Sequence, residues 1–216
     1  LTGGLGADTL DAGSGSDAYV WKKGDGADTI NDTSAVLTET DSLTLSNVAS
    51  TEATLTRNGG DLIVTIVATG ESLTIANQYY ESIDEFGAVS AAAGYGVEAI
   101  AFSDGVIWSL NDIVGHTLTN GTAGADILNG TWNYADQLYG LVGNDTVYGL
   151  DGNDTLVGGL GADILDGGNG SDIYVWNKGD GADKISDSSI TLTETDILAL
   201  GDVASNDVTL TRSGFN

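Results

Sequence analysis

Six aspartates recur at nearly regular intervals in the second half of the chain. They are Asp126, Asp136, Asp145, Asp154, Asp163 and Asp172, the last five spaced nine residues apart. Each follows a glycine-rich stretch and precedes, by two positions, an apolar or aromatic residue. Carboxylates and the carbonyls of tight glycine turns are hard oxygen ligands, which suit Ca²⁺ better than Zn²⁺ or copper. The spacing therefore predicts a repeated calcium site.

The elements that must position these aspartates are short strands. In each nine-residue unit the residues around the apolar position make a minimal strand, with the apolar side chain inward because side chains alternate faces. One unit then forms half a coil, and strands two units apart stack at about 4.8 Å in a parallel β-roll. A cation between stacked turns would take ligands from both. The alternative is a metal-free solenoid whose aspartates serve only as turn residues, but such turns do not require Asp at one fixed position.

Composition restricts the classes of function. The 216 residues include 32 acidic and six basic ones, a net charge of −26 that excludes nucleic acid as a partner. Such a charge opposes compaction unless something neutralises it. A hydrophobic content of 41% argues against disorder, and the absence of cysteine excludes disulfides and thiolate metal sites. No apolar run approaches the roughly 18 residues of a membrane span.

A longer repeat overlies the short one. Residues 1–59 align without gaps on residues 156–214, with 40 of 59 positions identical, at an offset of 155. We call these two ranges the first and second copies. We expect a tandem 155-residue module from a long array: the end of a first β-roll (1–34), a β-rich domain (35–115), a second β-roll (116–189) and the start of the next β-rich domain (190–216).

The β-rich domain shows signals for hairpins. Turn residues at 58–60, 69–70 and 103–105 predict antiparallel hairpins between strand-like runs. Ser82 and Glu85 form a capping box, which predicts a short helix over 82–93. His116 and the residues to Asn120 are expected to form a loop into the second roll. Four bulky residues are expected to cap the ends of the rolls: Tyr19, Trp21, Tyr174 and Trp176.

The motifs together resemble those of a known family. The units GLVGNDTVY, GLDGNDTLV, GGLGADILD and GGNGSDIYV, and the segments YVWNKGDGADKISD, LTRNGGDLIVTI and AFSDGVIWSL, are similar to the RTX, or haemolysin-type calcium-binding, family of secreted bacterial proteins. The resemblance implies an all-β fold in which a calcium-binding parallel β-roll (β-solenoid) alternates with an antiparallel β-hairpin domain. It also implies an extracellular or cell-surface protein, exported unfolded by type I secretion and folding on external calcium.

The resemblance also implies a ligand set. In the second roll it comprises Asp126, Asp145, Asp154, Asp163 and Asp172, with the carbonyls of Gly121, Gly124, Gly140, Gly143, Gly149, Gly152, Gly158 and Gly161. In the first roll it comprises Asp8 and Asp17, with Gly3, Gly6, Gly13 and Gly15. Asp28 and Asp183, in the KGDGAD segments, belong to the last, degenerate turns. Asp136 is a doubtful ligand because Tyr134 replaces a glycine before it, and a left-handed tyrosine is costly.

Catalysis is not expected. The single histidine, His116, has no triad-like spacing, and no HExxH, nucleophile elbow or Walker-type loop occurs. We expect a calcium-binding structural repeat of a large secreted protein, such as a surface fibre, adhesin stalk or surface layer, with neighbouring copies as partners. Two alternatives remain open. One is the C-terminal secretion or folding domain of an RTX toxin or hydrolase. The other is a module recognising surface glycans or other cells through aromatic residues, with Tyr79, Tyr80, Tyr95, Trp108 and Trp132 as candidates.

Overall fold

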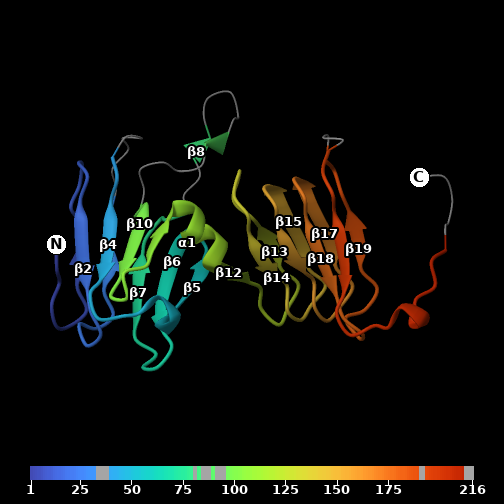
Figure 1. The fold of residues 1–216 in the computed structure, drawn as a ribbon, viewed down its shortest axis with the longest axis horizontal. Helices are drawn as coiled ribbons and strands as arrows, with labels where there is room; N and C mark the ends of the chain where they lie inside the picture. Colours follow the sequence, from blue (N-terminus) through green and yellow to red (C-terminus); the bar gives the residue numbers. More distant parts are fainter. Residues whose placement is uncertain (33–38, 80–81, 84–88, 91–95, 190–192, 212–216) are drawn as a thin grey trace.

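The protein is an elongated stack of β-strands. The computed structural model describes residues 1–32, 39–79, 82–83, 89–90, 96–189 and 193–211. The chain begins at one end of the stack, and its last described residues lie at the other (Figure 1). One ten-stranded sheet extends through the stack, in the order β1-β3-β7-β6-β5-β12-β14-β16-β18-β20. Two four-stranded sheets, β11-β10-β4-β2 and β13-β15-β17-β19, and the pair β8-β9 complete the described strands.

The second half is a parallel β-roll, as the sequence predicts. On the side of the long sheet its strands are β12 (Thr117–Asn120), β14 (Gln137–Tyr139), β16 (Thr155–Val157), β18 (Ile173–Trp176) and β20 (Ile197–Leu200). On the other side they are β13 (Ile127–Asn129), β15 (Thr146–Asp151), β17 (Ile164–Asn169) and β19 (Lys184–Ser186). In the regular part, paired residues are 18 apart, so two nine-residue units make one turn.

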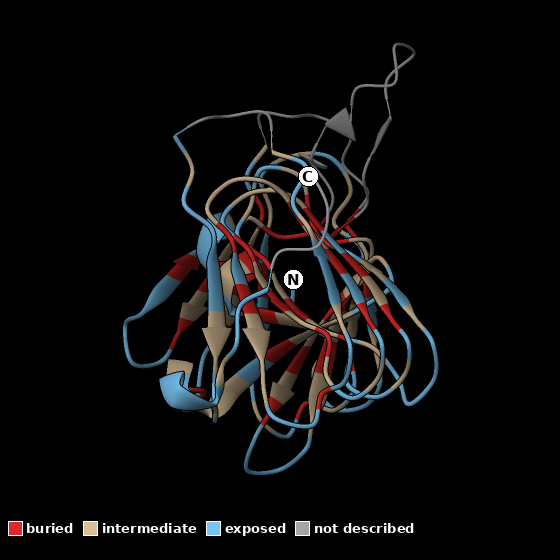
Figure 2. Ribbon diagram, turned by 90° about the vertical axis from the view of Figure 1, so that its right-hand side faces the viewer, coloured by how far each residue is buried: buried red, intermediate tan, exposed pale blue. Residues whose placement is uncertain are grey.

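The apolar position of each unit forms the core of this roll. The buried cluster comprises Leu138, Val147, Leu156, Leu165 and Tyr174, with Leu128 partly buried against it. These are the six side chains that the repeat directs inward. Seen along the stack, buried positions alternate with more exposed ones along the strands (Figure 2).

The first half combines roll turns with hairpins in the same sheet. Its long-sheet strands are β1 (Thr9–Leu10), β3 (Thr29–Ile30), β7 (Ser72–Ile75), β6 (Asp61–Ile66) and β5 (Ala53–Asn58), which follows the 3₁₀ turn η1 (Ser50–Glu52). The opposite sheet contains β2 (Ala18–Trp21), β4 (Ser42–Leu45), β10 (Ala99–Phe102) and β11 (Ile107–Ser109). Strands β5, β6 and β7 pair antiparallel, while β3–β7 and β5–β12 pair parallel. The hairpins therefore continue the roll.

The three predicted hairpins are confirmed. Asn58 pairs with Asp61 across Gly59 and Gly60, and Gly59 has a φ of 62°. Thr65 pairs with Ser72 on either side of the turn at 69–70. Strands β10 and β11 pair antiparallel across the turn at 103–105. The 3₁₀ turn η2 (Ser205–Asp207) is the last element of the described chain.

The predicted helix over 82–93 is wrong for its described residues. Strand β8 (Ser82–Ile83) pairs antiparallel with β9 (Val89–Ser90), and the rest of that range lies outside the described residues. The β-branched Ile83 and Val89 favour extended backbone, which outweighs the capping box.

The prediction of a loop at His116 is also wrong. Helix α1 (Leu110–His116) and strand β12 occupy this region. The helix begins at a capping box, because Asp112 Oδ2 accepts from the Ser109 amide at 2.9 Å and Ser109 Oγ accepts from the Asp112 amide. His116 stacks on Trp108, with ring centroids 4.2 Å apart.

Tyr19 and Trp21 do not close the first roll as caps. Both are buried, at 0% and 2% exposed, inside the core of the first half. Strand β4 stacks in parallel on β2, and β10 stacks in parallel on β4. The coil therefore continues past these aromatic residues, which act as core side chains.

Two turns of the second roll place leucine in a left-handed conformation. Leu141 and Leu150 have φ of 75° and 80°, whereas Gly159 and Gly168 hold the equivalent place one turn later at 90° and 91°. Such a conformation costs an L-residue roughly 1–2 kcal/mol. At the irregular turn near Tyr134 the positive φ falls on Asn133, at 66°. The backbone of that turn thus differs from that of the regular turns.

Leu141→Gly should stabilise the protein. Leu141 is 46% exposed, so little packing is lost, and glycine removes the left-handed strain. The greater backbone entropy of glycine in the unfolded chain offsets about 0.4–1 kcal/mol of this gain. We expect the free energy of unfolding to rise by about 0.5 kcal/mol, measured by urea denaturation in calcium. The matched control is Leu160→Gly, because Leu160 is 53% exposed and has no positive φ. It should lower the free energy of unfolding by about 0.5–1 kcal/mol, and equal effects of both variants would contradict the strain.

Candidate metal centre

Hydrogen bonds between aspartates join the turns of the second roll. The Oδ1 atom of each aspartate accepts from the backbone amide of the aspartate one turn earlier, at 2.8 to 3.1 Å. These bonds form two rows along the roll. The first row is Asp126, Asp145, Asp163 and Asp183, and the second row is Asp136, Asp154, Asp172 and Asp196.

The second oxygen of the interior carboxylates has no hydrogen-bond partner within the described part of the chain. It is the buried Oδ2 atom of Asp145, Asp154, Asp163 and Asp172, whose residues are at most 1% exposed. A buried oxygen of a charged group without a partner costs several kcal/mol. A bound cation would satisfy these oxygens.

Glycine leaves the space that such a group needs. A methyl group on Gly140 would overlap both the Gly158 carbonyl oxygen and Asp145 Oδ2. A methyl group on Gly149 would overlap the Gly167 carbonyl oxygen and Asp154 Oδ2. Carbonyl and carboxylate oxygens therefore converge on the same small spaces. This donor set, all hard oxygen, fits Ca²⁺.

The other predicted glycines lie in the same turns. Gly158 and Gly3 lie against the carboxylates of Asp163 and Asp8, and Gly121 lies against the Gly140 carbonyl. The carbonyls of Gly124, Gly143, Gly152, Gly161 and Gly6 each face the glycine one turn later in their row, namely Gly143, Gly161, Gly170, Gly181 and Gly26. Gly13 and Gly15 have positive φ, at 79° and 123°. The structure thus brings these glycines to the turn edges, where the prediction requires them.

Burial raises the pKa of three of these carboxyls, those of Asp154, Asp163 and Asp172. Desolvation is the largest cause in each case, and the neighbouring aspartates of the same row add repulsion. The pKa of Asp154 rises to about 7, and those of Asp163 and Asp172 rise as well. Bound calcium would oppose both causes, since it favours the ionised form.

The first aspartate of each row differs from the interior ones. Asp126 Oδ2 accepts from the Thr122 amide and hydroxyl, at 2.6 and 2.8 Å. In the same way Asp136 accepts from the Thr131 amide and hydroxyl, at 2.6 and 2.7 Å. Both carboxylates therefore have protein donors. Asp126 stays a predicted ligand, and the doubt about Asp136 gains a structural reason.

The first copy shows the same arrangement. Asp28 Oδ1 accepts from the Asp8 amide at 2.9 Å, and Asp41 Oδ1 accepts from the Asp17 amide at 2.7 Å. The Oδ2 atoms of Asp8, Asp17 and Asp41 are buried without a hydrogen-bond partner in the described structure. The predicted ligands Asp8, Asp17 and Asp28 thus lie in the rows.

Sequence reasoning missed Asp41 and its copy Asp196. Each continues a row of hydrogen-bonded aspartates, Asp41 after Asp17 and Asp196 after Asp172, although the nine-residue spacing stops before them. Asp17 and Asp41 are 24 residues apart, as are Asp172 and Asp196, which exceeds one 18-residue turn by six. The usable signal was the Asp-x-Leu triplet at 41–43 and 196–198, which repeats the aspartate-to-apolar step of the regular units.

Comparison with known proteins agrees with this geometry. The model of the RTX calcium-binding nonapeptide repeat matches residues 1–19 and 139–174. The model of the haemolysin-type calcium binding protein related domain matches residues 61–112. The chain therefore carries RTX nonapeptide repeats, which bind calcium, together with the related domain. The resemblance drawn from the sequence is confirmed.

Comparison with whole proteins adds little. No curated protein matches the chain. Among solved structures, the extracellular lipase LipA from Serratia marcescens matches 82% of this chain at 18% identity and a TM-score of 0.29. The match covers only 29% of the lipase chain. Within the described residues, the one α-helix has seven residues, and no helix has the length and apolarity of a membrane span.

Asp163→Asn should weaken calcium binding more than Asp136→Asn. The first change removes charge from a buried interior carboxylate, whereas the second affects a carboxylate already bonded by Thr131. We expect an apparent affinity loss of about tenfold or more for Asp163→Asn, by analogy with lost metal-site partners. Isothermal titration calorimetry measures it. An equal or larger loss of calcium affinity for Asp136→Asn would show that the hydrogen bonds from Thr131 do not make Asp136 a weaker ligand than Asp163.

The pH dependence of stability should reverse with calcium. Without calcium, the folded pKa of Asp154, about 7, exceeds the unfolded value, so the folded state binds more protons between about pH 4 and 7. The calcium-free protein should therefore melt at a lower temperature at pH 7.5 than at pH 5.5. In millimolar calcium the order should invert, because the metal requires ionised carboxylates. Thermal melts at the two pH values, in metal-depleted buffer and in calcium buffer, measure these changes. The same change of melting temperature with pH in both buffers would contradict the mechanism.

Proposed function

We propose that this chain is a structural module of a large secreted bacterial protein, which folds when it meets extracellular calcium. The observation that carries the proposal is the pair of carboxylate rows with buried, unpartnered oxygens. In a chain with 32 acidic and six basic residues, most carboxylates lack a basic partner. Calcium between turns neutralises the rows and links each turn to the next. Its role here is mechanical, and the chain is proposed to have no catalytic activity.

Magnitudes support calcium as a folding switch. Extracellular calcium modules bind with Kd of about 10⁻⁴ to 10⁻³ M. At about 1 mM calcium, a site with Kd of about 0.1 mM contributes about 1.4 kcal/mol. Four such sites contribute on the order of 6 kcal/mol, comparable to the whole stability of a domain. At micromolar calcium the contribution is near zero, which would keep the roll unfolded for export.

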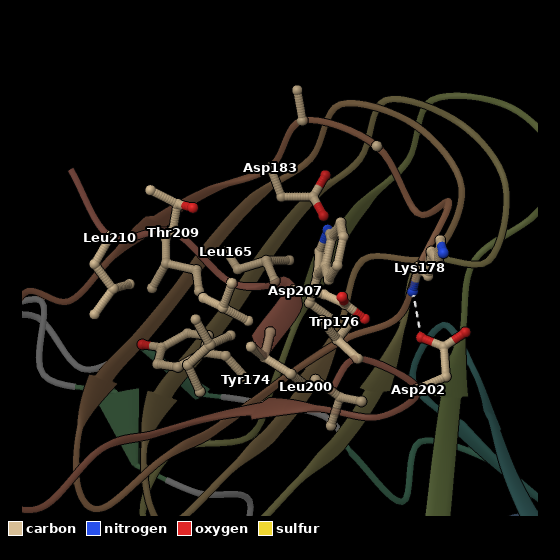
Figure 3. A pocket seen from close by; sticks show the side chains of 17 residues that line it. Leu165, Tyr174, Trp176, Lys178, Asp183, Leu200, Asp202, Asp207, Thr209 and Leu210 are labelled. Atoms are coloured by element: carbon tan, nitrogen blue, oxygen red, sulfur yellow. Dashed lines mark hydrogen bonds between the residues drawn. The ribbon is translucent and has the colours of Figure 1, made fainter. Parts of the chain in front are cut away.

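The apolar end of the second roll supports a role in a repeating array. A cavity of about 780 Å³ is lined by Leu165, Tyr174, Trp176, Leu200 and Leu210 among others (Figure 3). In the first copy, Leu43 is 0% exposed because β10 pairs with its strand, whereas the equivalent Leu198 is 53% exposed. A surface of this kind is suited to packing against a further β-layer. Stacked modules would form a stiff fibre, stalk or surface layer.

Recognition of glycans receives less support. Tyr79 and Trp108 are 6% and 9% exposed, so they are core residues, not stacking platforms. Tyr80 and Tyr95 lie outside the described residues. Trp132 lines a cavity of about 200 Å³ with Tyr148 and Leu150, which is below the roughly 300–1,000 Å³ of ordinary ligand pockets. A role as the C-terminal secretion or folding domain of a toxin or hydrolase remains compatible with the same calcium chemistry.

Calcium should be required for the roll to fold. In chelator at pH 7.5, circular dichroism should show a reduced β signal, and 1–5 mM calcium should restore it. The same concentration of Mg²⁺ should restore little, because Mg²⁺ demands a tighter octahedral set of ligands and dehydrates reluctantly. In calcium, small-angle scattering should give an elongated particle. Identical β content with and without chelator would refute the proposed switch.

A further inference from the structure

A third carboxylate lies beside the paired aspartates Asp17 and Asp41, where the nine-residue spacing ends. Single carboxylate oxygens of Asp17, Asp32 and Asp41 all lie within 4.8 Å of one another. Asp32 comes from the segment that follows β3, outside the nine-residue pattern, and neither it nor Asp41 is exposed to solvent. The interior turns of the second roll have no such third aspartate among the described residues grouped in this way.

An unsatisfied oxygen points to a ligand at this cluster. Asp41 is 0% exposed, its Oδ1 accepts from the Asp17 amide, and its Oδ2 is buried without a hydrogen-bond partner in the described structure. Asp17 Oδ2 is in the same state. Asp32 is held in place by the Tyr19 hydroxyl, which donates to its Oδ2 at 2.7 Å. Three carboxylates are thus fixed around oxygens that lack a donor.

A fourth carboxylate lies next to this cluster. Glu98 Oε2 accepts from the Asp41 amide at 2.6 Å, and the Asp41 carbonyl accepts from the Glu98 amide at 2.9 Å. A cation bound here would offset the negative charge that the four carboxylates bring together.

The same cluster recurs 155 residues later. Oxygens of Asp172, Asp187 and Asp196 also lie within 4.8 Å of one another. These residues are the exact sequence equivalents of Asp17, Asp32 and Asp41. Asp172 is buried, whereas Asp187 and Asp196 are exposed. Each copy therefore carries the cluster in the same place relative to its roll, under different degrees of cover.

We propose that these two clusters are a second kind of calcium site, in which Asp32 and Asp187 are ligands together with the row aspartates. Three carboxylates give it more negative charge than an interior turn offers, and ligand charge is a main determinant of calcium affinity. The buried first cluster binds more tightly than the exposed second one. Such a site goes beyond the role proposed above, since it assigns ligands outside the repeat and divides the calcium sites into two classes.

Asp32→Asn tests the first cluster. The amide oxygen of asparagine still accepts from the Tyr19 hydroxyl, while one of the three charges is lost. We expect the affinity of the tightest calcium-binding step to fall by about tenfold or more in calorimetric titration. In metal-depleted buffer the same variant should melt at a higher temperature than the parent protein, because repulsion within the cluster decreases. A purely structural role for Asp32 would leave calcium binding unchanged, and that result would overturn the proposal.

Two further measurements keep the test independent. The control variant Asp11→Asn removes an exposed carboxylate within the first roll and should leave the tightest step unchanged. Crystals grown in Tb³⁺ should show anomalous density between Asp17, Asp32 and Asp41 as well as in the interior turns. Density in the interior turns alone would refute the cluster sites and leave the calcium-dependent module intact. Density nowhere along the rows would refute both.

Discussion

The hydrogen bond from each aspartate amide to the aspartate carboxylate one turn later is the interaction on which the structure depends. It sets the register between turns and uses one carboxylate oxygen, leaving the other buried beside glycine carbonyls. Stacked turns place these like charges about 4.8 Å apart. At an effective dielectric constant of about 20, two such charges repel by about 3 kcal/mol. The bond that orders the roll thus also brings together the carboxylates that calcium would neutralise.

The long sheet explains how a roll and a set of hairpins form one body. Strand β3 ends the first roll turns and pairs in parallel with β7, and β5 pairs in parallel with β12 at the start of the second roll. Between them, β7, β6 and β5 pair antiparallel. An odd number of hairpin strands restores the strand direction. The roll therefore resumes in the same sense without leaving an open sheet edge inside the stack.

Local regularity decided how much of this structure the sequence could predict. The nine-residue period is enough to predict the parallel pairing, the inward apolar positions and the rows from Asp145 to Asp172, because each follows from neighbouring repeats. Asp41 and Asp196 could not be predicted from the period, because six additional residues interrupt it while the turns continue to stack.

Capping boxes were a poor guide to helices in this chain. Helix α1 was not predicted, although Ser109 and Asp112 form a capping box. A helix was predicted at Ser82, although the β-branched residues at 83 and 89 favour strands. A capping box alone does not show whether tertiary contacts favour a helix or a strand at that position.

The two ends of the second row differ in chemistry. At the start of the second roll, Thr122 and Thr131 supply hydrogen-bond donors to Asp126 and Asp136. These turns come after helix α1 and strand β12. The buried residues Ile113 and Val114 of α1 belong to the core of the first half. Farther along, the Oδ2 atoms of Asp145, Asp154, Asp163 and Asp172 have no such donor within the described structure, and the second row ends in the cluster of Asp172, Asp187 and Asp196. In the proposed calcium-dependent folding, order that begins against the hairpin core would extend along the roll as calcium binds to these turns.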